Sequence, residues 1–465
     1  MSLMVSISGI RGIVGESLSP ETVVRYASAF GGYCKDRTGA AGEVVLGRDG
    51  RSSGRTIADL IASALASTGV RVRDLGICPT PTVQLAVEGT KAAGGISVTA
   101  SHNPIQWNGM KFVAPTGMVL DAEENRAFWA IAERTPGYVS WEGPGSRTQD
   151  SSWIKKHIDA VMGIPLLDLS RMRQRRLKVV LDCVNAAGGV IVPTLLNELG
   201  CDVVEMNCDV SGVFPRLPEP VPENLTDLAA QVRASRADFG VAVDPDVDRL
   251  VLITERGEPF GEEYTVASAV KFVLDRVSRA AKGKTPSPDR VVVNLSTTRA
   301  VEEIAASYGA SVFRTPVGEI NVAKKMKEVD AIIGGEGSGG VIYPAVHLGR
   351  DAMVGIGLIL QLIAEFEGTV SQLKASLPQF SIVKGKIDIG QKQAEIILGK
   401  IMESHAGTGK VNLEDGLKID FPDHWVHLRK SNTEPIIRII AEARTRAEAL
   451  AVVEKYRGIV AALGT

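Results

Sequence analysis

Cysteine is scarce in this chain of 465 residues, and none of its five cysteines stands in a C-x-x-C pair. Their number is odd and they are scattered, which argues against a disulfide framework and favours free thiols in a reducing cytoplasm. The six histidines are dispersed as well. The sequence therefore does not predict a zinc site, because such sites need closely spaced Cys and His ligands.

Long apolar runs and an excess of charge of one sign are also missing. No uninterrupted apolar stretch approaches the roughly 20 residues that cross a bilayer. The stretch Met1-Ser2-Leu3-Met4-Val5 has neither the basic leader nor the apolar core of a signal peptide. We therefore expect a cytoplasmic protein without a membrane partner. The formal net charge of −2 gives no electrostatic reason to expect a nucleic-acid partner.

A strand–helix–strand pattern occurs three times along the chain. The first copy predicts strands at residues 44–49, 70–75 and 94–99, with a helix at 55–68 and another helix at 20–33 before the repeat. The second copy predicts strands at 178–182, 202–206 and 239–243, and the third at 291–294, 311–314 and 331–333. Three successive units of this kind indicate three related α/β domains.

The chain changes character after residue 368. Strands are predicted at 382–389, 417–421, 426–428 and 436–441, and helices at 393–404 and 446–463. This order is typical of an α+β module with an antiparallel sheet. Gly, Pro and charged residues gather near 144–150, 255–261 and 366–368, which places domain boundaries there. The predicted domains are 1–147, 148–254, 255–368 and 369–465.

The last strand of each repeat runs directly into a polar loop. The three loops are Thr99-Ala100-Ser101-His102-Asn103-Pro104, Asp244-Pro245-Asp246-Val247-Asp248-Arg249 and Gly335-Glu336-Gly337-Ser338-Gly339-Gly340. Open α/β sheets bind ligands at the carboxyl ends of their strands. Equivalent strand ends with different polar loops therefore predict one shared cleft.

The acidic loop carries Asp244, Asp246 and Asp248 at alternate positions. Side chains at such positions of an extended or looped segment share a face, so their oxygens can converge on a hard cation such as Mg²⁺. The alternative is a solvated acidic turn. The position directly after an apolar strand, without the longer EF-hand spacing, favours the metal site.

Other residues carry weaker signals when each is taken alone. The Ser101 hydroxyl on a Pro-terminated turn could serve as an acceptor or nucleophile, or it could only make local backbone bonds. A second donor-rich segment is Arg429-Lys430-Ser431-Asn432-Thr433-Glu434-Pro435, which suits a phosphate dianion or an ordinary hairpin loop. Glu336 and Ser338 lie among glycines, which either let the backbone approach a sugar whose hydroxyls the carboxylate binds or form only a flexible loop. Arg11 and Lys111 are cations that either assist phosphoryl transfer or lie on the surface.

Taken together, these segments resemble the α-D-phosphohexomutase superfamily, which interconverts hexose 6-phosphates and hexose 1-phosphates. The resemblance extends from Ser8-Gly9-Ile10-Arg11-Gly12 to the segment that begins at Arg429, and so covers nearly the whole chain. Further family-like segments are Gly47-Arg48-Asp49-Gly50-Arg51, Pro222-Glu223-Asn224-Leu225 and Thr315-Pro316-Val317-Gly318. The ordered set is specific, although single segments are not.

The resemblance implies four domains around a central cleft: three related α/β domains with mixed sheets and a C-terminal α+β domain. Ser101 would be the phosphoserine. Asp244, Asp246 and Asp248 would hold Mg²⁺ together with the phosphoserine oxygen, and a sugar 1,6-bisphosphate would be the intermediate and activator. The remaining implied roles are phosphoryl or proton transfer for Arg11, His102, Lys111 and Arg249, sugar recognition for Glu336 and Ser338, and phosphate binding for Arg429, Ser431, Asn432 and Thr433.

The implied substrate is a small hexose phosphate, and two signals on its identity conflict. Asn432 is common among mannose and glucose mutases, whereas Ser8–Gly12 and the segment Val341-Ile342-Tyr343-Pro344 resemble a branch assigned to glucosamine phosphate. The prediction is glucosamine phosphate, with mannose or glucose phosphate as the alternative. Many bacterial members carry His where this chain has Gly340. A metal-dependent sugar phosphatase or a non-catalytic sugar-phosphate sensor remains open, as does the choice between monomer and homodimer.

Overall fold

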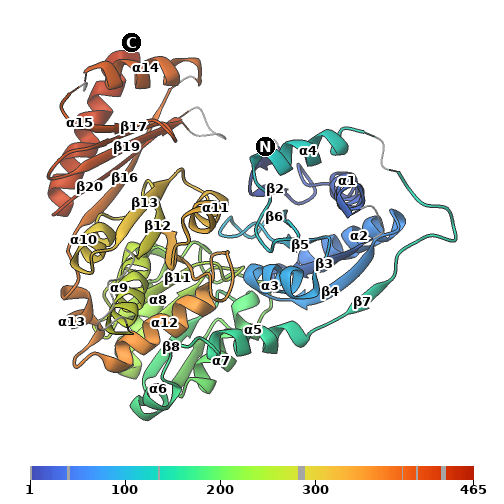
Figure 1. Ribbon diagram of the computed structural model, residues 1–465, viewed down its shortest axis with the longest axis horizontal. Helices are drawn as coiled ribbons and strands as arrows, with labels where there is room; N and C mark the ends of the chain where they lie inside the picture. The colour runs from blue at the N-terminus through green and yellow to red at the C-terminus, as the bar shows by residue number, and fades with distance from the viewer. Residues whose placement is uncertain are drawn as a thin grey trace.

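The computed structural model describes residues 3–38, 42–134, 137–280, 289–389, 391–404, 407–430 and 436–464. These residues form four sheets, each with its own helices (Figure 1). The first module, in blue, and the C-terminal module, in red, lie at opposite sides of the upper edge of the view. The second and third modules, in green and yellow, lie below and to the left. We use the word module for one sheet with its helices.

The first sheet has seven strands in the order β1-β2-β6-β5-β3-β4-β7. The strands are β1 Met4–Ser6, β2 Gly9–Ile13, β3 Glu43–Arg48, β4 Arg71–Ile77, β5 Gly94–Val98, β6 Trp107–Val113 and β7 Arg147–Gln149. The helices are α1 Pro20–Thr38, α2 Gly54–Ser67, α3 Thr80–Thr90 and α4 Ala122–Ala132.

The second and third sheets have four strands each. The second module contains α5 Ser152–Met162, α6 Leu169–Arg175, β8 Lys178–Asp182, η1 Ala187–Val190, α7 Val192–Glu198, β9 Asp202–Met206, η2 Pro222–Asn224, α8 Thr226–Ser235, β10 Phe239–Val243 and β11 Leu250–Thr254. The third contains α9 Glu262–Ala280, β12 Arg290–Asn294, α10 Ala300–Ser307, β13 Ser311–Thr315, α11 Glu319–Val329, β14 Ile333–Glu336, β15 Gly340–Ile342, α12 Ala352–Glu365 and α13 Val370–Ala375.

One strand order occurs in all three modules: β4-β3-β5-β6, β9-β8-β10-β11 and β13-β12-β14-β15. The first three strands of each set are parallel and the fourth is antiparallel. This confirms the threefold repeat and the mixed sheets. Each polar loop is therefore the turn of a hairpin, β5–β6, β10–β11 or β14–β15, at the carboxyl end of the parallel strands.

The fourth sheet has the order β16-β20-β19-β18-β17, and every neighbouring pair in it is antiparallel. Its strands are β16 Ser381–Asp388, β17 Lys410–Asn412, β18 Leu417–Asp420, β19 Trp425–Lys430 and β20 Ile436–Ala443. Helices α14 Gln391–Ser404 and α15 Arg446–Gly464 belong to the same module. The prediction of a C-terminal α+β module is confirmed.

The apolar cores show which modules are joined most firmly. Strands β5 and β10 are buried along their whole length, as expected for strands covered on both faces. The second and third modules share one large core that includes helix α12, whereas the first and fourth modules have cores of their own. No helix among the described residues is long and apolar enough to cross a membrane.

Three local predictions differ from the structure. No strand was predicted around Arg11, but this residue lies in strand β2, which pairs with β6. Strand β14 begins at Ile333 and continues through two glycines to Glu336, where the glycine content suggested a loop. Cross-strand pairing with β12 and β15 outweighs the weak strand preference of glycine. Helix α1 continues to Thr38, beyond the predicted end at residue 33.

Candidate active site

Ser101 lies in the loop between β5 and β6, where the first module contacts the second. Its side chain is buried and its backbone has a φ of 49°, a conformation that is uncommon for a non-glycine residue. Ser101 Oγ donates to Asp244 Oδ2 at 3.2 Å and lies 3.3 Å from His102 Nδ1. The predicted phosphate acceptor and the predicted metal loop are therefore in direct contact.

Arg51 holds the backbone of the Ser101 loop in place through hydrogen bonds, a role that the sequence did not predict. The guanidinium is fully buried and donates to Asp49 Oδ2 at 3.0 Å. It also donates to four backbone carbonyls of the loop and its flank, those of Ser101, Asn103, Pro104 and Trp107. All of its donors are thereby engaged. The segment Gly47–Arg51 drew attention only as a family-like segment, because sequence cannot show where an arginine side chain ends.

The acidic loop brings Asp244, Asp246 and Asp248 together, as predicted. One carboxylate oxygen from each lies within 4.8 Å of the others, and all three side chains are buried. The loop is a tight turn in which Val247 has a φ of 61°. A β-branched residue in this conformation is strained, and such strain is typical of functional loops.

These carboxylates suit a divalent cation. Asp246 Oδ1 and Asp248 Oδ1 are buried without a hydrogen-bond partner, which is costly unless an ion or ligand engages them. Burial, together with the charges of Asp248 and Asp246, raises the pKa of Asp244 well above its ordinary value. Burial also raises the pKa of Asp248, but Arg350, Lys111 and Arg249 outweigh this effect and lower it. The oxygen donor set is that preferred by Mg²⁺.

Lys111 and Thr80 complete the acidic cluster. Lys111 Nζ donates to Asp246 Oδ2 at 2.6 Å and to Asp248 Oδ2 at 2.9 Å. Burial lowers the pKa of Lys111, but the two carboxylates outweigh it and hold the pKa above its ordinary value. Thr80, at the start of α3, donates to Asp246 Oδ2 at 2.7 Å. Thr80 was not predicted, and only the fold brings it to the metal loop.

Three further residues singled out from sequence, Arg11, His102 and Arg249, lie near the Ser101 loop, and their roles in the reaction stay a prediction. Arg11 donates to Asn103 Oδ1 at 3.0 Å, and burial lowers its pKa. The positive charge of Arg249, and then burial, hold the pKa of His102 well below its ordinary value, so the imidazole is neutral. Arg249 Nε lies 3.8 Å from Asp248 Oδ1. The cluster thus places two cations and one neutral proton acceptor beside the serine.

The sugar-loop residue Glu336 is buried and engaged by three donors. Its Oε1 accepts from Asn294 Nδ2 and from the Gly318 N–H, each at 2.8 Å. Its Oε2 accepts from Arg350 at 2.7 Å. Ser338 lies half-buried in the turn that follows. Arg350 and Asn294 were not predicted, although Gly349-Arg350-Asp351 repeats the Gly-Arg-Asp order of residues 47–49.

Arg429 lies at the end of β19, on the side of the C-terminal module that contacts the third module. Its guanidinium pairs with Asp415 Oδ2 at 2.9 Å, and the same oxygen accepts from the Val317 N–H at 2.9 Å. Since Gly318 contacts Glu336, Arg429 is connected to the sugar loop through Asp415. The predicted phosphate ligands Ser431, Asn432 and Thr433 lie outside the described residues.

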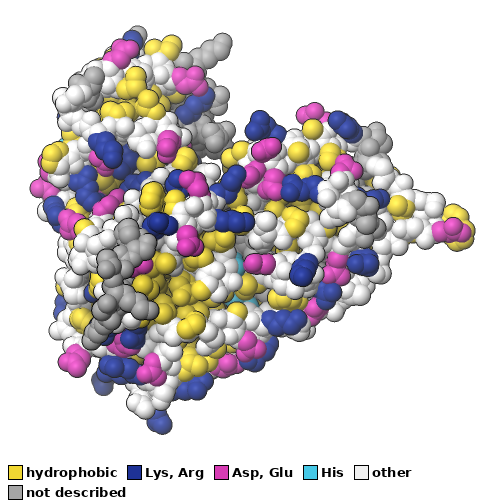
Figure 2. Space-filling view, viewed as in Figure 1, with side chains coloured by type: hydrophobic (Ala, Val, Ile, Leu, Met, Phe, Trp, Pro, Cys, Tyr) yellow, Lys and Arg dark blue, Asp and Glu magenta, His cyan; other side chains and the backbone are white. Residues whose placement is uncertain are grey.

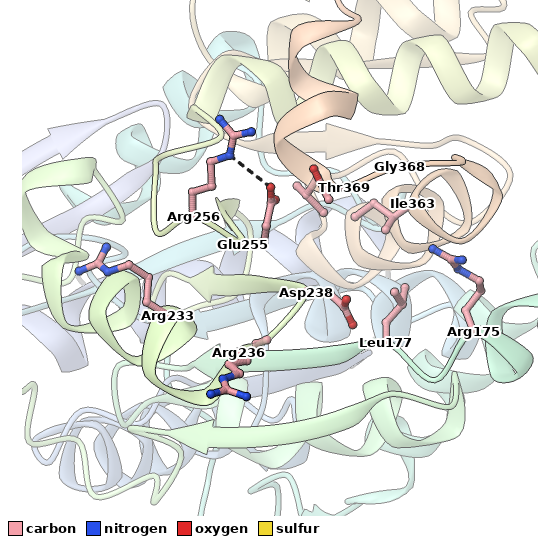
Figure 3. Close-up of a pocket in the computed structure, with 12 residues that line it drawn as sticks. Arg175, Leu177, Arg233, Arg236, Asp238, Glu255, Arg256, Ile363, Gly368 and Thr369 are labelled. Carbon is pink, nitrogen blue, oxygen red and sulfur yellow. Dashed lines mark ion pairs between the residues drawn. The ribbon is translucent and has the colours of Figure 1, made fainter.

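Figure 2 shows a notch between the C-terminal module, at the upper left, and the first module, at the upper right, with Lys and Arg side chains along its lower edge. A separate cavity of about 520 Å³ lies between α6, α8, the β11 end and the start of α13, away from these loops. Figure 3 shows that Arg175, Arg233, Arg236 and Arg256 are spread around its rim. None of the polar loop residues lines that cavity.

Comparison with known proteins agrees with this arrangement over the whole chain. Four models of the phosphoglucomutase/phosphomannomutase family match: α/β/α domain I at residues 4–137, domain II at 155–257, domain III at 269–380 and the C-terminal domain at 383–458. The exact domain boundaries proposed from sequence stay a prediction.

Individual relatives and one solved structure are similar over almost their full lengths. A phosphoglucomutase/phosphomannomutase of Thermococcus kodakarensis is 38% identical, with 95% of this chain and 94% of the relative covered. A probable phosphoglucosamine mutase of Methanopyrus kandleri is 33% identical, with 97% and 96% covered. The structure of a phosphoglucomutase/phosphomannomutase family protein of Burkholderia thailandensis is 27% identical, covers 99% and 98%, and has a TM-score of 0.84. The chain therefore belongs to the phosphoglucomutase/phosphomannomutase family and is a phosphohexomutase, an isomerase.

Proposed function

We propose that this phosphohexomutase uses Ser101 as its phosphoryl carrier and that its preferred substrate is glucosamine phosphate. The observation that carries the first part is the buried Ser101 hydroxyl, 3.2 Å from the acidic loop and 3.3 Å from a neutral imidazole. Hydrogen bonds from Arg51 hold the turn that carries this hydroxyl, and Arg11 and Arg249 lie nearby. These are the conditions that phosphoryl transfer requires.

Asp244, Asp246 and Asp248 would hold Mg²⁺, which supplies positive charge against the transferring phosphoryl group. The side chains of Arg11 and Arg249 add fixed positive charge on the same side. Charge that is already in place needs no reorganisation when the reaction occurs. Arg51 keeps the Ser101 backbone in one position throughout.

The reaction proceeds in two transfers. In the first, the Oγ–P bond of phosphorylated Ser101 breaks while a bond forms between phosphorus and the free hydroxyl oxygen of the sugar monophosphate; the sugar hydroxyl loses its proton, Ser101 Oγ takes one up, and the product is a sugar 1,6-bisphosphate. In the second, the bond between the other phosphorus and its sugar oxygen breaks while Ser101 Oγ bonds to that phosphorus, and the sugar oxygen takes up a proton to become the new free hydroxyl. The Ser101 hydroxyl must then lose its proton, and His102 Nδ1 is placed 3.3 Å away to accept it.

His102 is favoured over the other two candidates for this proton. Lys111 is paired with two carboxylates, which keep it protonated. Arg11 is a guanidinium and does not act as a base near neutral pH. His102 alone among the three is neutral.

The choice of sugar rests on the segments that resemble the branch assigned to glucosamine phosphate and on the names of the similar proteins. The glycine-rich hairpin with Glu336 supports hydroxyl recognition, because a buried carboxylate suits vicinal hydroxyl donors. The Methanopyrus relative is called a probable phosphoglucosamine mutase. The Thermococcus relative, which has the higher identity, is called a phosphoglucomutase/phosphomannomutase, and this keeps glucose and mannose phosphates as the alternative.

The test is an assay of the purified protein with Mg²⁺ and a sugar 1,6-bisphosphate activator. Glucosamine, mannose and glucose 6-phosphates are compared by kcat/KM. We expect the highest value for glucosamine 6-phosphate. A higher value for either neutral sugar would assign the chain to the alternative. Release of inorganic phosphate without isomerisation would indicate a phosphatase instead.

A further inference from the structure

Arg350 is a buried cation between the metal loop and the sugar loop. It lies in the segment Gly349-Arg350-Asp351 that joins β15 to α12, and its side chain is 11% exposed. Asp351 caps α12 by accepting from the Met353 N–H at 2.8 Å. It also contacts His157 and His347. The backbone that carries Arg350 is therefore anchored at its next residue.

The guanidinium of Arg350 bridges the two loops directly. One terminal nitrogen donates to Glu336 Oε2 at 2.7 Å, and the other donates to Asp248 Oδ2 at 2.7 Å. Its Nε lies 3.5 Å from Glu319 Oε2 and is buried without a hydrogen-bond partner. A planar guanidinium can hold two carboxylates at once, which the point charge of a lysine cannot do with the same geometry.

Gly340 provides the space through which Arg350 reaches these partners. A Cβ atom added at residue 340 would lie 2.3 Å from Arg350 Cδ and 2.9 Å from its Cγ. The backbone of Gly340 does not have the positive φ that disfavours other residues. Its requirement for glycine is therefore a requirement for space. A side chain at residue 340 could therefore not coexist with Arg350 in its observed position.

Glu336 depends on Arg350 for its third bond. An ionised carboxylate has about four acceptor sites, and Asn294, Gly318 and Arg350 occupy three of them. One site thus stays free for a hydroxyl donor. Loss of Arg350 would free a second site and remove the only charged partner that the carboxylate has in this cluster of contacts.

We propose that Arg350 is a positioning residue for sugar recognition: it orients Glu336 and ties it to Asp248, and Gly340 is the space that makes this possible. The proposal rests on the function proposed for Glu336 and deepens it by naming the residue that orients this carboxylate. Sugar binding and the metal loop would then be linked through one guanidinium.

The test compares four proteins: the parent, Arg350→Ala, Gly340→Ala and the double variant. A lost charged hydrogen bond weakens binding about tenfold to a hundredfold, so each single variant should raise KM for the hexose phosphate by this factor with a smaller change in kcat. Gly340→Ala should add less than about twofold in the Arg350→Ala background, because the clash has gone. Arg350→Lys should recover only part of the loss.

Binding is measured separately from turnover, by calorimetric titration of glucosamine 6-phosphate and mannose 6-phosphate into Ser101→Ala versions of the same proteins. Gly458→Ala, on α15 with open space around it, is the matched control for glycine replacement. Equal affinities with and without Arg350, or additive losses in the double variant, would overturn the proposal. If Arg350→Ala does not fold, Gly340→Ala still displaces the side chain and decides the question.

Failure of the proposed function would appear differently. The parent itself would then prefer a neutral sugar phosphate, or its Ser101→Ala version would retain turnover. If the parent binds and turns over, only the comparison among the variants bears on Arg350.

Discussion

The loops of the first three modules and the C-terminal module differ in how they are held in place. The loops of the first three modules carry buried residues that hydrogen bonds hold together. Ser101 donates to Asp244, Lys111 donates to Asp248, and Arg350 joins Asp248 to Glu336. The C-terminal module has a separate core. It meets the third module through polar contacts, among them Ser296 Oγ with His427 Nδ1 at 2.9 Å and the Arg299 N–H with Glu442 Oε2 at 2.9 Å.

This difference suggests that phosphoryl transfer and binding of the other substrate phosphate are assigned to different parts of the molecule. The groups proposed to surround the transferring phosphoryl are held in place by these bonds, and reorganisation of such groups would raise the reaction barrier. Arg429, which the family resemblance implies as a ligand of the substrate phosphate that is not being transferred, belongs to the C-terminal module. The interface of this module is polar, and polar interfaces permit relative motion more readily than a shared apolar core. The following experiments test this division, beginning with the largest expected effect.

Ser101→Ala removes the proposed phosphoryl carrier from the preorganised side. We expect mutase turnover to fall by at least roughly a thousandfold, as is typical when a nucleophile is lost. Intact mass should show a phosphate on the parent only. Ser67→Ala, which changes an exposed serine of α2, is the control and should retain parental activity. Full turnover by the Ser101 variant would reject the carrier.

Asp246→Asn weakens the metal loop. Asp246 is buried and its Oδ1 has no partner among the described residues, so we expect Mg²⁺ affinity and kcat each to fall by roughly 10- to 100-fold. The fold should persist, because the side chain ends a strand and fills no apolar core. Calorimetric titration with Mg²⁺ measures the affinity, with the exposed Asp423→Asn as control. Unchanged affinity would exclude Asp246 as a ligand.

Arg429→Ala tests the C-terminal module. A phosphate site on this module must act whichever end of the sugar faces Ser101. Charged hydrogen bonds to phosphate are worth about 1.5–3 kcal/mol, so kcat/KM should fall roughly ten- to a hundredfold in both reaction directions. Arg457→Ala, on the surface of α15, is the matched control. A loss in one direction only would show that Arg429 does not bind the phosphate in both orientations of the sugar.

His427→Gln tests the polar interface through pH. Burial lowers the pKa of His427 to about 4, against an ordinary value of 6.5. Between these values the unfolded state binds more protons than the folded state, so stability falls as the pH drops from about 6.5 to 4. The effect is at most about 3 kcal/mol. The melting temperature should therefore change less with pH over this range in the variant than in the parent. Equal slopes of melting temperature against pH would show that His427 does not cause the loss of stability.

Several features could be predicted from sequence because they depend on local pattern. The repeated strands follow from apolar runs of strand length, and the position of each polar loop follows from where a run ends. The convergence of Asp244, Asp246 and Asp248 was likewise predicted, because their spacing is short. The path of β14 was not, because pairing with β12 and β15 rather than residue preference makes Gly334 and Gly335 extended.

The sequence by itself therefore determined the modules, the order of their loops and the kinds of chemical group on them. Only the tertiary structure decided which groups meet: Arg51 beneath Ser101, Thr80 and Lys111 on Asp246, and Arg350 between Asp248 and Glu336. These pairs are separated by tens to hundreds of residues along the chain. Such contacts arise from packing within and between modules, and a local pattern carries no information about where the end of a long side chain lies.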